Sequence, residues 1–259
     1  MDDGVAYDPA TGISVGHPFN TMYVRAPVQV IGPDLVMVGW DLNEGELNSI
    51  GQVVAASLDL DDPDAQWRTS KWPLPPPGLE SIKTATDGTD LLVMVWASNP
   101  DVCAGPQSCH RLLRFTPSTG AWTDLGVYPH RLQDLSSGGG RVYGTANFTA
   151  SGQTWDDSSF AHVVEVEPDD GSVTSLGNPG SYGHLLVSDT GRLALVGGAD
   201  IRVRNLSGQW QALPAVPGDP LYPAVVWAGD DLLVWGGAAA LDRPGSHDVA
   251  DGWIFRSPT

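Results

Sequence analysis

Lysine is nearly absent from this chain of 259 residues, and basic residues of any kind are few. Only 13 Lys and Arg residues stand against 31 Asp and Glu residues, which gives a formal net charge of −18 at pH 7. Such a surface repels phosphate backbones and anionic lipids, and it has few cations with which to release their counterions. We therefore expect no nucleic-acid partner.

Long apolar runs are also missing. A membrane-spanning helix needs about 18 or more consecutive apolar residues, and no such run is present, so the sequence predicts no membrane insertion. The start of the chain, Met1-Asp2-Asp3-Gly4, has neither the basic residues nor the apolar core of a secretory signal peptide. A signal peptide is therefore not part of the sequence that we read.

Cysteine is scarce, and the two cysteines lie close together at Cys103 and Cys109. This spacing suits a small disulfide loop better than a zinc site, which would need two more ligands nearby. A disulfide predicts an oxidising compartment. We expect an extracellular or cell-envelope protein whose signal peptide is missing from this chain, with the cytoplasm as the alternative.

The common catalytic and metal-binding motifs are lacking as well. The six histidines do not form a His-x-His or His-x3-His pair, so the sequence predicts no metal site. A glycine-rich phosphate loop and a Gly-x-Ser-x-Gly nucleophile elbow are also absent. We expect no cofactor and, on balance, no enzymatic activity.

The chain contains instead a short pattern that returns at intervals of about 50 residues, which is typical of repeat proteins. Each copy has two apolar strands joined by an Asp or Gly turn, a third strand with an aromatic residue, and a fourth that opens on Trp. The clearest copies are residues 113–122 and 5–13. Four antiparallel strands per repeat, arranged radially, predict an all-β protein with the β-propeller fold.

The predicted strands occupy four positions in each repeat. The innermost strands are expected at 26–31, 82–86, 132–136, 184–187 and 223–227. The second strands are expected at 35–40, 91–96, 141–145, 192–197 and 232–236. The third are expected at 5–8, 53–58, 111–116, 162–167, 201–205 and 253–257. The fourth strands open at Ile13, Trp67, Trp122, Val173 and Trp210.

Glycine pairs and aromatic residues punctuate these repeats. Gly197-Gly198 and Gly236-Gly237 end second strands, where a side chain would prevent close approach, and Phe115 and Trp122 can fill the wedge between twisted sheets. With the best copy at 232–237 and 251–255, the chain resembles the Kelch-repeat β-propeller family, which includes galactose-oxidase-like central propellers. The resemblance implies a single propeller domain over residues 1–259. Three second strands lack the glycine pair, and Val173 replaces Trp in the third repeat.

The strand inventory is uneven, because six third strands stand against five in each other position. The favoured reading is six blades, in which one blade has lost its first two strands and another its last strand. In that reading the chain is truncated at the N-terminus. The alternative is a ring of five blades with one surplus strand.

Long loops are expected on one face of the propeller, where the second strand joins the third. These loops span 41–51, 97–110, 146–161 and 238–252. The same face holds the connections between blades, whose residues can form an aromatic and cationic mouth around the central channel. The candidate ligand-binding residues at this mouth are Arg25, Arg131, Tyr23, Tyr128, His130 and Tyr222.

Two function classes follow, together with a third possibility. The first is a non-catalytic binding or scaffold module that takes a protein or glycan on the long-loop face. The alternative is an exported carbohydrate-active enzyme, glycosidase-like, which would need two carboxylates about 5 to 10 Å apart at the channel mouth. The third is an incomplete propeller with no activity alone. Copper oxidase chemistry is not expected, because it would need a Tyr, Cys and His set and the only cysteines are the loop pair.

Overall fold

The computed structural model describes residues 5–7, 14–16, 22–24, 28–42, 50–62, 64–74, 81–103, 108–128, 131–147, 162–197, 200–216, 223–237 and 252–256. These residues form antiparallel sheets with one four-residue helix, α1 (Pro100–Cys103). The prediction of an all-β protein built from four-stranded antiparallel units is confirmed.

Five sheets follow one another along the chain. The first contains β3 (Met22–Val24), β4 (Gln29–Ile31), β5 (Asp34–Leu42), β6 (Ile50–Asp59) and β7 (Arg68–Lys71). The second contains β8 (Ser81–Thr86), β9 (Leu91–Ala97), β10 (Cys109–Thr116) and β11 (Ala121–Tyr128). The third contains β12 (Arg131–Gly138), β13 (Arg141–Asn147), β14 (His162–Val166) and β15 (Val173–Ser175).

The last two of these sheets are shorter. The fourth sheet contains β16 (His184–Val187), β17 (Leu193–Gly197), β18 (Asp200–Arg204) and β19 (Trp210–Ala212). The fifth contains β20 (Ala224–Ala228), β21 (Asp231–Trp235) and β22 (Gly252–Phe255). A separate two-stranded sheet is formed by β1 (Val5–Tyr7) and β2 (Ser14–Gly16).

In a sheet that lies between two others, the second strand is apolar on both faces because a neighbouring sheet covers each face. In β9, Leu91, Val93 and Val95 belong to the core shared with the first sheet. Leu92 and Met94 point the other way and belong to the core shared with the third sheet. Since side chains alternate along a strand, a nearly continuous apolar run supplies two cores at once.

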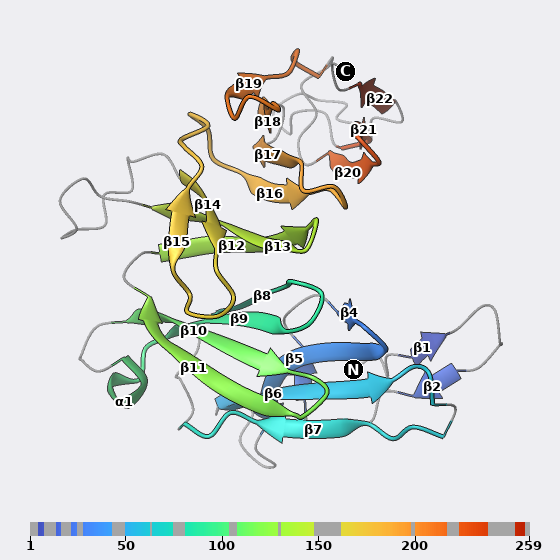
Figure 1. The fold of residues 1–259 in the computed structure, drawn as a ribbon, viewed down its shortest axis with the longest axis vertical. Coiled ribbons are helices and arrows are strands. Elements are labelled where there is room, and N and C mark those ends of the chain that lie inside the picture. The colour runs from blue at the N-terminus through green and yellow to red at the C-terminus, as the bar shows by residue number, and fades with distance from the viewer. Residues whose placement is uncertain are drawn as a thin grey trace, which may run out of the picture.

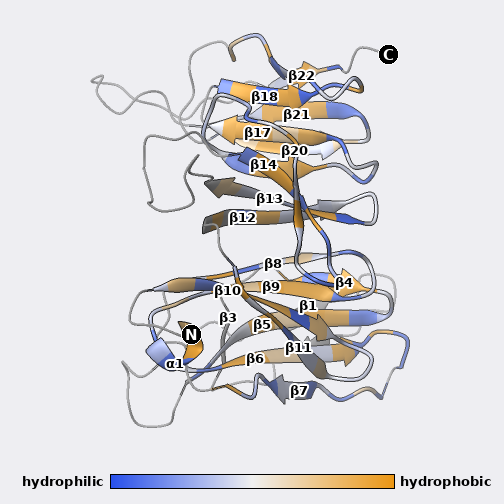
Figure 2. Cartoon of the chain, turned by 60° about the vertical axis from the view of Figure 1, so that its left-hand side comes forward, coloured by the Kyte–Doolittle hydropathy of each residue, from blue (hydrophilic) through white to orange (hydrophobic). Residues whose placement is uncertain are grey.

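The five sheets are stacked face to face, with apolar cores between successive sheets. Figure 1 shows that their innermost strands, β4, β8, β12, β16 and β20, follow an open arc, from which the other strands radiate outward. Figure 2 shows the apolar strands inside each sheet and the hydrophilic turns at its ends. This is the radial arrangement of a propeller.

Tryptophans that open fourth strands fill the space between neighbouring sheets, as the sequence predicts. The Trp122 ring packs against Phe115 with the ring centroids 4.9 Å apart, and its Nε1 donates a hydrogen bond to the Ser70 carbonyl of the previous sheet at 3.4 Å. Trp210 repeats this contact by donating to the Leu176 carbonyl at 3.0 Å. Each indole therefore joins two sheets by packing and by one hydrogen bond.

Two of the sheets have fewer than four strands among the described residues. The β1–β2 sheet holds a third and a fourth strand, and the fifth sheet holds a first, second and third strand. Among the described residues, no strand pairing joins β22 to β1. The choice between six blades and five therefore stays a prediction.

Candidate functional site

The ends of the sheets define two faces of the molecule. The tight turns between first and second strands, and between third and fourth strands, lie at one end, which we call the turn face. The strand ends that lead into the connections between second and third strands, and into those between successive sheets, lie at the other end, which we call the loop face. The mouth predicted from the sequence belongs to the loop face.

The structure describes three of the six predicted mouth residues, two of them only in their backbone. Tyr23 lies in β3 and Arg131 begins β12, but their side chains are outside the described part of the structure. Arg25, His130 and Tyr222 lie outside the described residues altogether. Tyr128 is described and 9% exposed. The binding role of these six residues stays a prediction.

Tyr128 ends an aromatic row that crosses the second sheet at the loop face. His110 lies opposite Trp96 on one neighbouring strand and opposite Tyr128 on the other. The Trp96 and His110 rings are stacked, with centroids 5.7 Å apart and planes at 14°. Burial raises the pKa of Tyr128 well above that of a free phenol. His110 and Tyr128 are buried and Trp96 is half-buried, so the row packs this end of the sheet with aromatic rings and exposes part of Trp96.

An aspartate on the innermost strand β12 connects three sheets at the loop face. The pairing of β12 with β13 shifts between Leu132 and Asp134, as in a β-bulge, and such irregularities redirect the side chains beside them. Asp134 Oδ2 accepts a hydrogen bond from the Leu185 backbone N–H at 3.3 Å, and it lies 3.6 Å from His184 Nδ1. Asp134 Oδ1 lies 4.0 Å from Lys83 Nζ.

Lys83, Asp134 and His184 therefore form a polar row across β8, β12 and β16. The His184 side chain is 85% exposed and Lys83 is 39% exposed, while Asp134 is 18% exposed. Lys83 and Asp134 were not among the site residues predicted from the sequence. A charged residue inside a predicted innermost strand was the signal that could have identified them. Innermost strands line the centre of a propeller, so a charged side chain there can reach a ligand.

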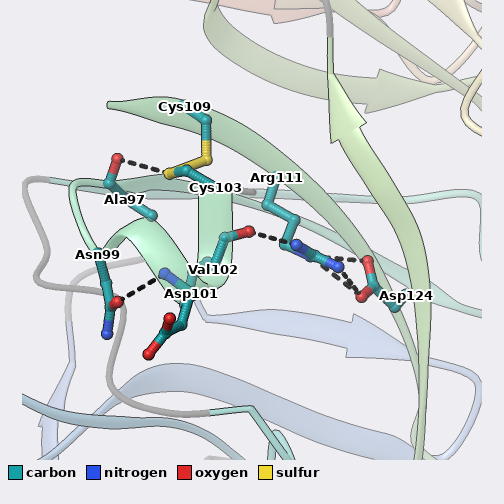
Figure 3. Close-up of a disulfide and its surroundings, with 8 residues drawn as sticks. All are labelled: Ala97, Asn99, Asp101, Val102, Cys103, Cys109, Arg111 and Asp124. Atoms are coloured by element: carbon teal, nitrogen blue, oxygen red, sulfur yellow. Dashed lines mark hydrogen bonds and ion pairs between the residues drawn. A yellow bond between two sulfur atoms is a disulfide. The ribbon is translucent and has the colours of Figure 1, made fainter. Parts of the chain in front are cut away.

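The loop between β9 and β10 is stapled by the disulfide that the sequence predicts. Cys103 and Cys109 are bonded, with their Cα atoms 5.4 Å apart (Figure 3). Asn99 begins the α1 turn: its carbonyl accepts bonds from the Val102 and Cys103 N–H groups, both at 3.0 Å. Its side-chain Oδ1 accepts the Asp101 N–H at 2.9 Å, as a helix-capping residue does.

Arg111 fixes the base of this stapled loop. Its Nε donates to the Asp124 carboxylate at 2.9 Å and 3.0 Å, and its Nη1 donates to the Val102 carbonyl (Figure 3). The guanidinium also lies 5.9 Å from the centre of the Trp72 ring. Because Trp72 is 1% exposed, the loop is tied to the buried core between the first two sheets.

The described part of the loop face thus combines a rigid loop, an aromatic row and a polar row. Such a surface can bind a ligand through ring stacking and through hydrogen bonds to charged side chains. In the described ranges, no group of three or more His, Cys, Asp or Glu side chains is placed to hold a metal ion. No described helix is long and apolar enough to cross a membrane.

Comparisons with known proteins support the fold. No protein-family model and no curated protein sequence matches the chain. Among solved structures 177 chains match, and one of them is the structure of YjhT, which is propeller-like. YjhT superposes with a TM-score of 0.54 over 86% of this chain and 74% of its own, at 16% sequence identity. At this identity the likeness shows the architecture alone.

Proposed function

We propose that this chain is a Kelch-like propeller that acts as a binding module and takes a protein or glycan ligand on its loop face. The observation that carries the proposal is the stapled loop, residues 97–110. Its base is held at once by a disulfide, a capped turn and the Arg111–Asp124 ion pair. A loop whose base is held on a packed sheet in this way is suited to recognition.

The physical advantage of the staple lies in the entropy of binding. A mobile loop must lose conformational freedom when it meets a ligand, and this loss subtracts from affinity. The disulfide closes a short ring between Cys103 and Cys109, so much of that freedom is removed before binding. The same disulfide supports our proposal of an extracellular or cell-envelope location, where thiols are oxidised.

The chemistry beside the loop fits both ligand classes. The half-buried Trp96 ring, stacked on the buried His110 ring, offers an aromatic contact of the kind that meets sugar rings or apolar side chains. Lys83 and His184 add exposed hydrogen-bond donors from neighbouring innermost strands. A ligand that spans the loop and the innermost strands would use both.

The test is a binding screen with an arrayed glycan library and a phage-displayed peptide library. The wild-type chain is compared with the Cys103→Ser/Cys109→Ser double variant and with His184→Ala. Asp189→Asn is the matched control, because Asp189 is an exposed residue in a tight turn on the opposite face. We expect binding to weaken by about tenfold in His184→Ala, as loss of a hydrogen bond to a charged group would predict. We expect a similar loss in the disulfide variant, because its loop must be ordered when the ligand binds, and we expect binding to persist in the control.

Three outcomes would contradict the proposal. The first is that no library member binds, and the second is that the control loses binding as fully as the loop-face variants. The third is turnover of p-nitrophenyl glycosides by the wild-type chain, which would favour the carbohydrate-active enzyme instead.

A further inference from the structure

A polar cavity of about 370 Å³ opens on the turn face, between the third and fourth sheets, away from the loop face. Its walls include Arg141 and Tyr143 of β13, Glu165 of β14, Thr190 of the β16–β17 turn, and Arg204 at the end of β18. The two sheets meet closely here, because a Cβ on Gly139 would lie 3.0 Å from the Gly191 nitrogen. The cavity is therefore framed by backbone on two sides.

The charges in this cavity do not balance. Arg141 Nη1 pairs with Glu165 Oε1 at 3.1 Å. This ion pair neutralises one of the two arginines and the single carboxylate in the lining. Arg204 pairs with no carboxylate among the described residues, and its buried Nε has no hydrogen-bond partner. Five other described arginines each pair with an aspartate: Arg68, Arg111, Arg114, Arg192 and Arg202.

A guanidinium held partly out of water without a partner is costly unless an anion joins it. The lining of two guanidiniums and one carboxylate has a net charge of one positive unit, within a chain whose net charge is −18. A site of this charge accommodates one negative charge. The rest of the acidic protein opposes a second one.

Tyr143 supplies a neutral donor beside the two arginines. Its side chain is 5% exposed, and a Cβ on Gly191 would lie 3.5 Å from its hydroxyl oxygen. Burial, with the nearby Glu165 carboxylate, raises the pKa of Tyr143, against the opposing effects of Arg141 and Arg204. The phenol therefore keeps its proton at neutral pH and can donate it in a hydrogen bond.

We propose that this cavity binds a small organic monocarboxylate, with Arg204 as its principal partner and Arg141 and Tyr143 as further donors. The planar fork of a guanidinium matches the two oxygens of a carboxylate. Leu176 and Leu193 in the lining give the organic part of the ligand an apolar contact. The volume lies in the range of small-molecule pockets.

The test uses benzoate and acetate as probes, and inorganic phosphate and sulfate as competing oxyanions, at constant ionic strength. Binding is followed by NMR chemical-shift changes on isotope-labelled protein. We expect benzoate to shift the resonances of Tyr143 and Arg204, and Arg204→Gln to weaken its affinity by about tenfold or more. Arg202→Gln is the matched control, since Arg202 lies on the same strand and pairs with Asp200 at 2.8 Å. We expect it to leave the affinity unchanged.

Thermal unfolding without ligand separates a ligand-binding arginine from a structural one. If Arg204 awaits an anion, Arg204→Leu removes an unpaired charge, and its melting temperature equals or exceeds that of the wild type. Benzoate then raises the melting temperature of the wild type and not of the variant.

The proposal is overturned if Arg204→Leu unfolds at a clearly lower temperature without ligand, or if Arg204→Gln and Arg202→Gln weaken benzoate equally. It is also overturned if no probe binds, or if phosphate or sulfate binds and the carboxylates do not. None of these results depends on the loop face, so they leave the proposed binding function untouched.

Discussion

A single carboxylate, that of Asp134, links three innermost strands at the loop face. It accepts the Leu185 N–H from β16 and faces Lys83 of β8 and His184 of β16. The bulge that redirects it needs room on the partner strand, and Gly144 provides that room, because a Cβ there would lie 2.9 Å from the Asp134 carbonyl oxygen. The side chain of Asp134 and the lack of a side chain at Gly144 thus together shape this part of the loop face.

We expect Asp134→Ala to lower the free energy of unfolding by about 1 to 2 kcal/mol, because it leaves the Leu185 N–H without its acceptor. Asp134→Asn should recover most of this loss, since an amide oxygen can accept the same hydrogen bond. Urea denaturation measures both. Equal losses in the two variants would mean that the negative charge, and not the hydrogen bond, is what stabilises the contact.

Two buried tyrosines make stability sensitive to alkali. Burial raises the pKa values of Tyr128 and Tyr143 above the ordinary 10.0. A group whose pKa is raised on folding binds its proton more tightly in the native state. Its contribution to stability is therefore complete below the pKa of the unfolded chain and is lost as the pH rises through the raised value.

The free energy of unfolding should therefore fall as the pH rises above about 10. Tyr128→Phe should make this fall less steep, because a phenylalanine cannot ionise. Denaturation at a series of alkaline pH values tests the expectation, and absorbance at 295 nm reports how many of the six tyrosines ionise late. A pH profile identical in wild type and variant would contradict it.

At the level of the elements, contact between sheets depends on glycines in the tight turns of the turn face. A Cβ on Gly138, at the end of β12, would lie 2.0 Å from the Ser188 carbonyl oxygen and 2.7 Å from Val187 Cγ1. Gly140, two residues later, has a φ of +72°, and the nearest atom to a Cβ there would be 3.9 Å away. The two glycines thus serve different purposes, close packing and backbone conformation.

Gly138→Ala should cost about 3 kcal/mol of stability, since the third and fourth sheets would have to separate to admit the methyl group. Gly140→Ala should cost only about 1 kcal/mol, the strain of placing an alanine in a left-handed conformation. Thermal and urea unfolding of both variants make the comparison. A Gly138→Ala variant as stable as Gly140→Ala would show that the sheets yield easily at this contact.

Most of the strands could be predicted because their signals are local. Apolar runs bounded by Asp and Gly turns marked β9, β13, β17 and β21 nearly to the residue, and a cysteine pair six residues apart marked its own disulfide. The first innermost strand was less well predicted. It was expected as one strand at 26–31, whereas the structure has β4 at 29–31 and a separate strand, β3, at 22–24, and both pair with β5. Two such short strands leave no clear periodic pattern.

At the scale of the whole molecule, charge acts against compactness. Ion pairs such as Arg68–Asp34 and Arg111–Asp124 use most of the few cations, and many carboxylates remain without a partner of opposite charge. Repulsion among these carboxylates destabilises the folded chain and extends over the distance that salt allows.

Raising sodium chloride from about 20 mM to about 300 mM at pH 7 should therefore raise the melting temperature, because the screening length falls. The increase should shrink near pH 4, where protonation of carboxylates lowers the net charge. Scanning calorimetry at both pH values measures the effect. A melting temperature that falls with salt at pH 7 would mean that screening of the ion pairs outweighs relief of the repulsion.

The ends of the arc expose apolar side chains that neighbouring sheets cover elsewhere. Trp235 and Ile254 of the fifth sheet are 52% and 59% exposed, and Val30 of β4 is 60% exposed. In the middle sheets the corresponding faces lie in continuous cores. The sequence pattern of each strand therefore predicted which of its faces is apolar. Only the packed sheets show which of these apolar faces are covered by a neighbouring sheet.

By itself, the sequence determined the all-β class, the four-strand repeat, the acidic surface and the disulfide, because each depends on composition or on residues close together in the chain. Only the tertiary structure brought Lys83, Asp134 and His184 together. It alone showed that Arg204, beside Arg141, pairs with no carboxylate in the described part of the chain. These groups come from different repeats about 50 residues apart. Which of their side chains meet is fixed by how successive sheets pack, and no local pattern records that packing.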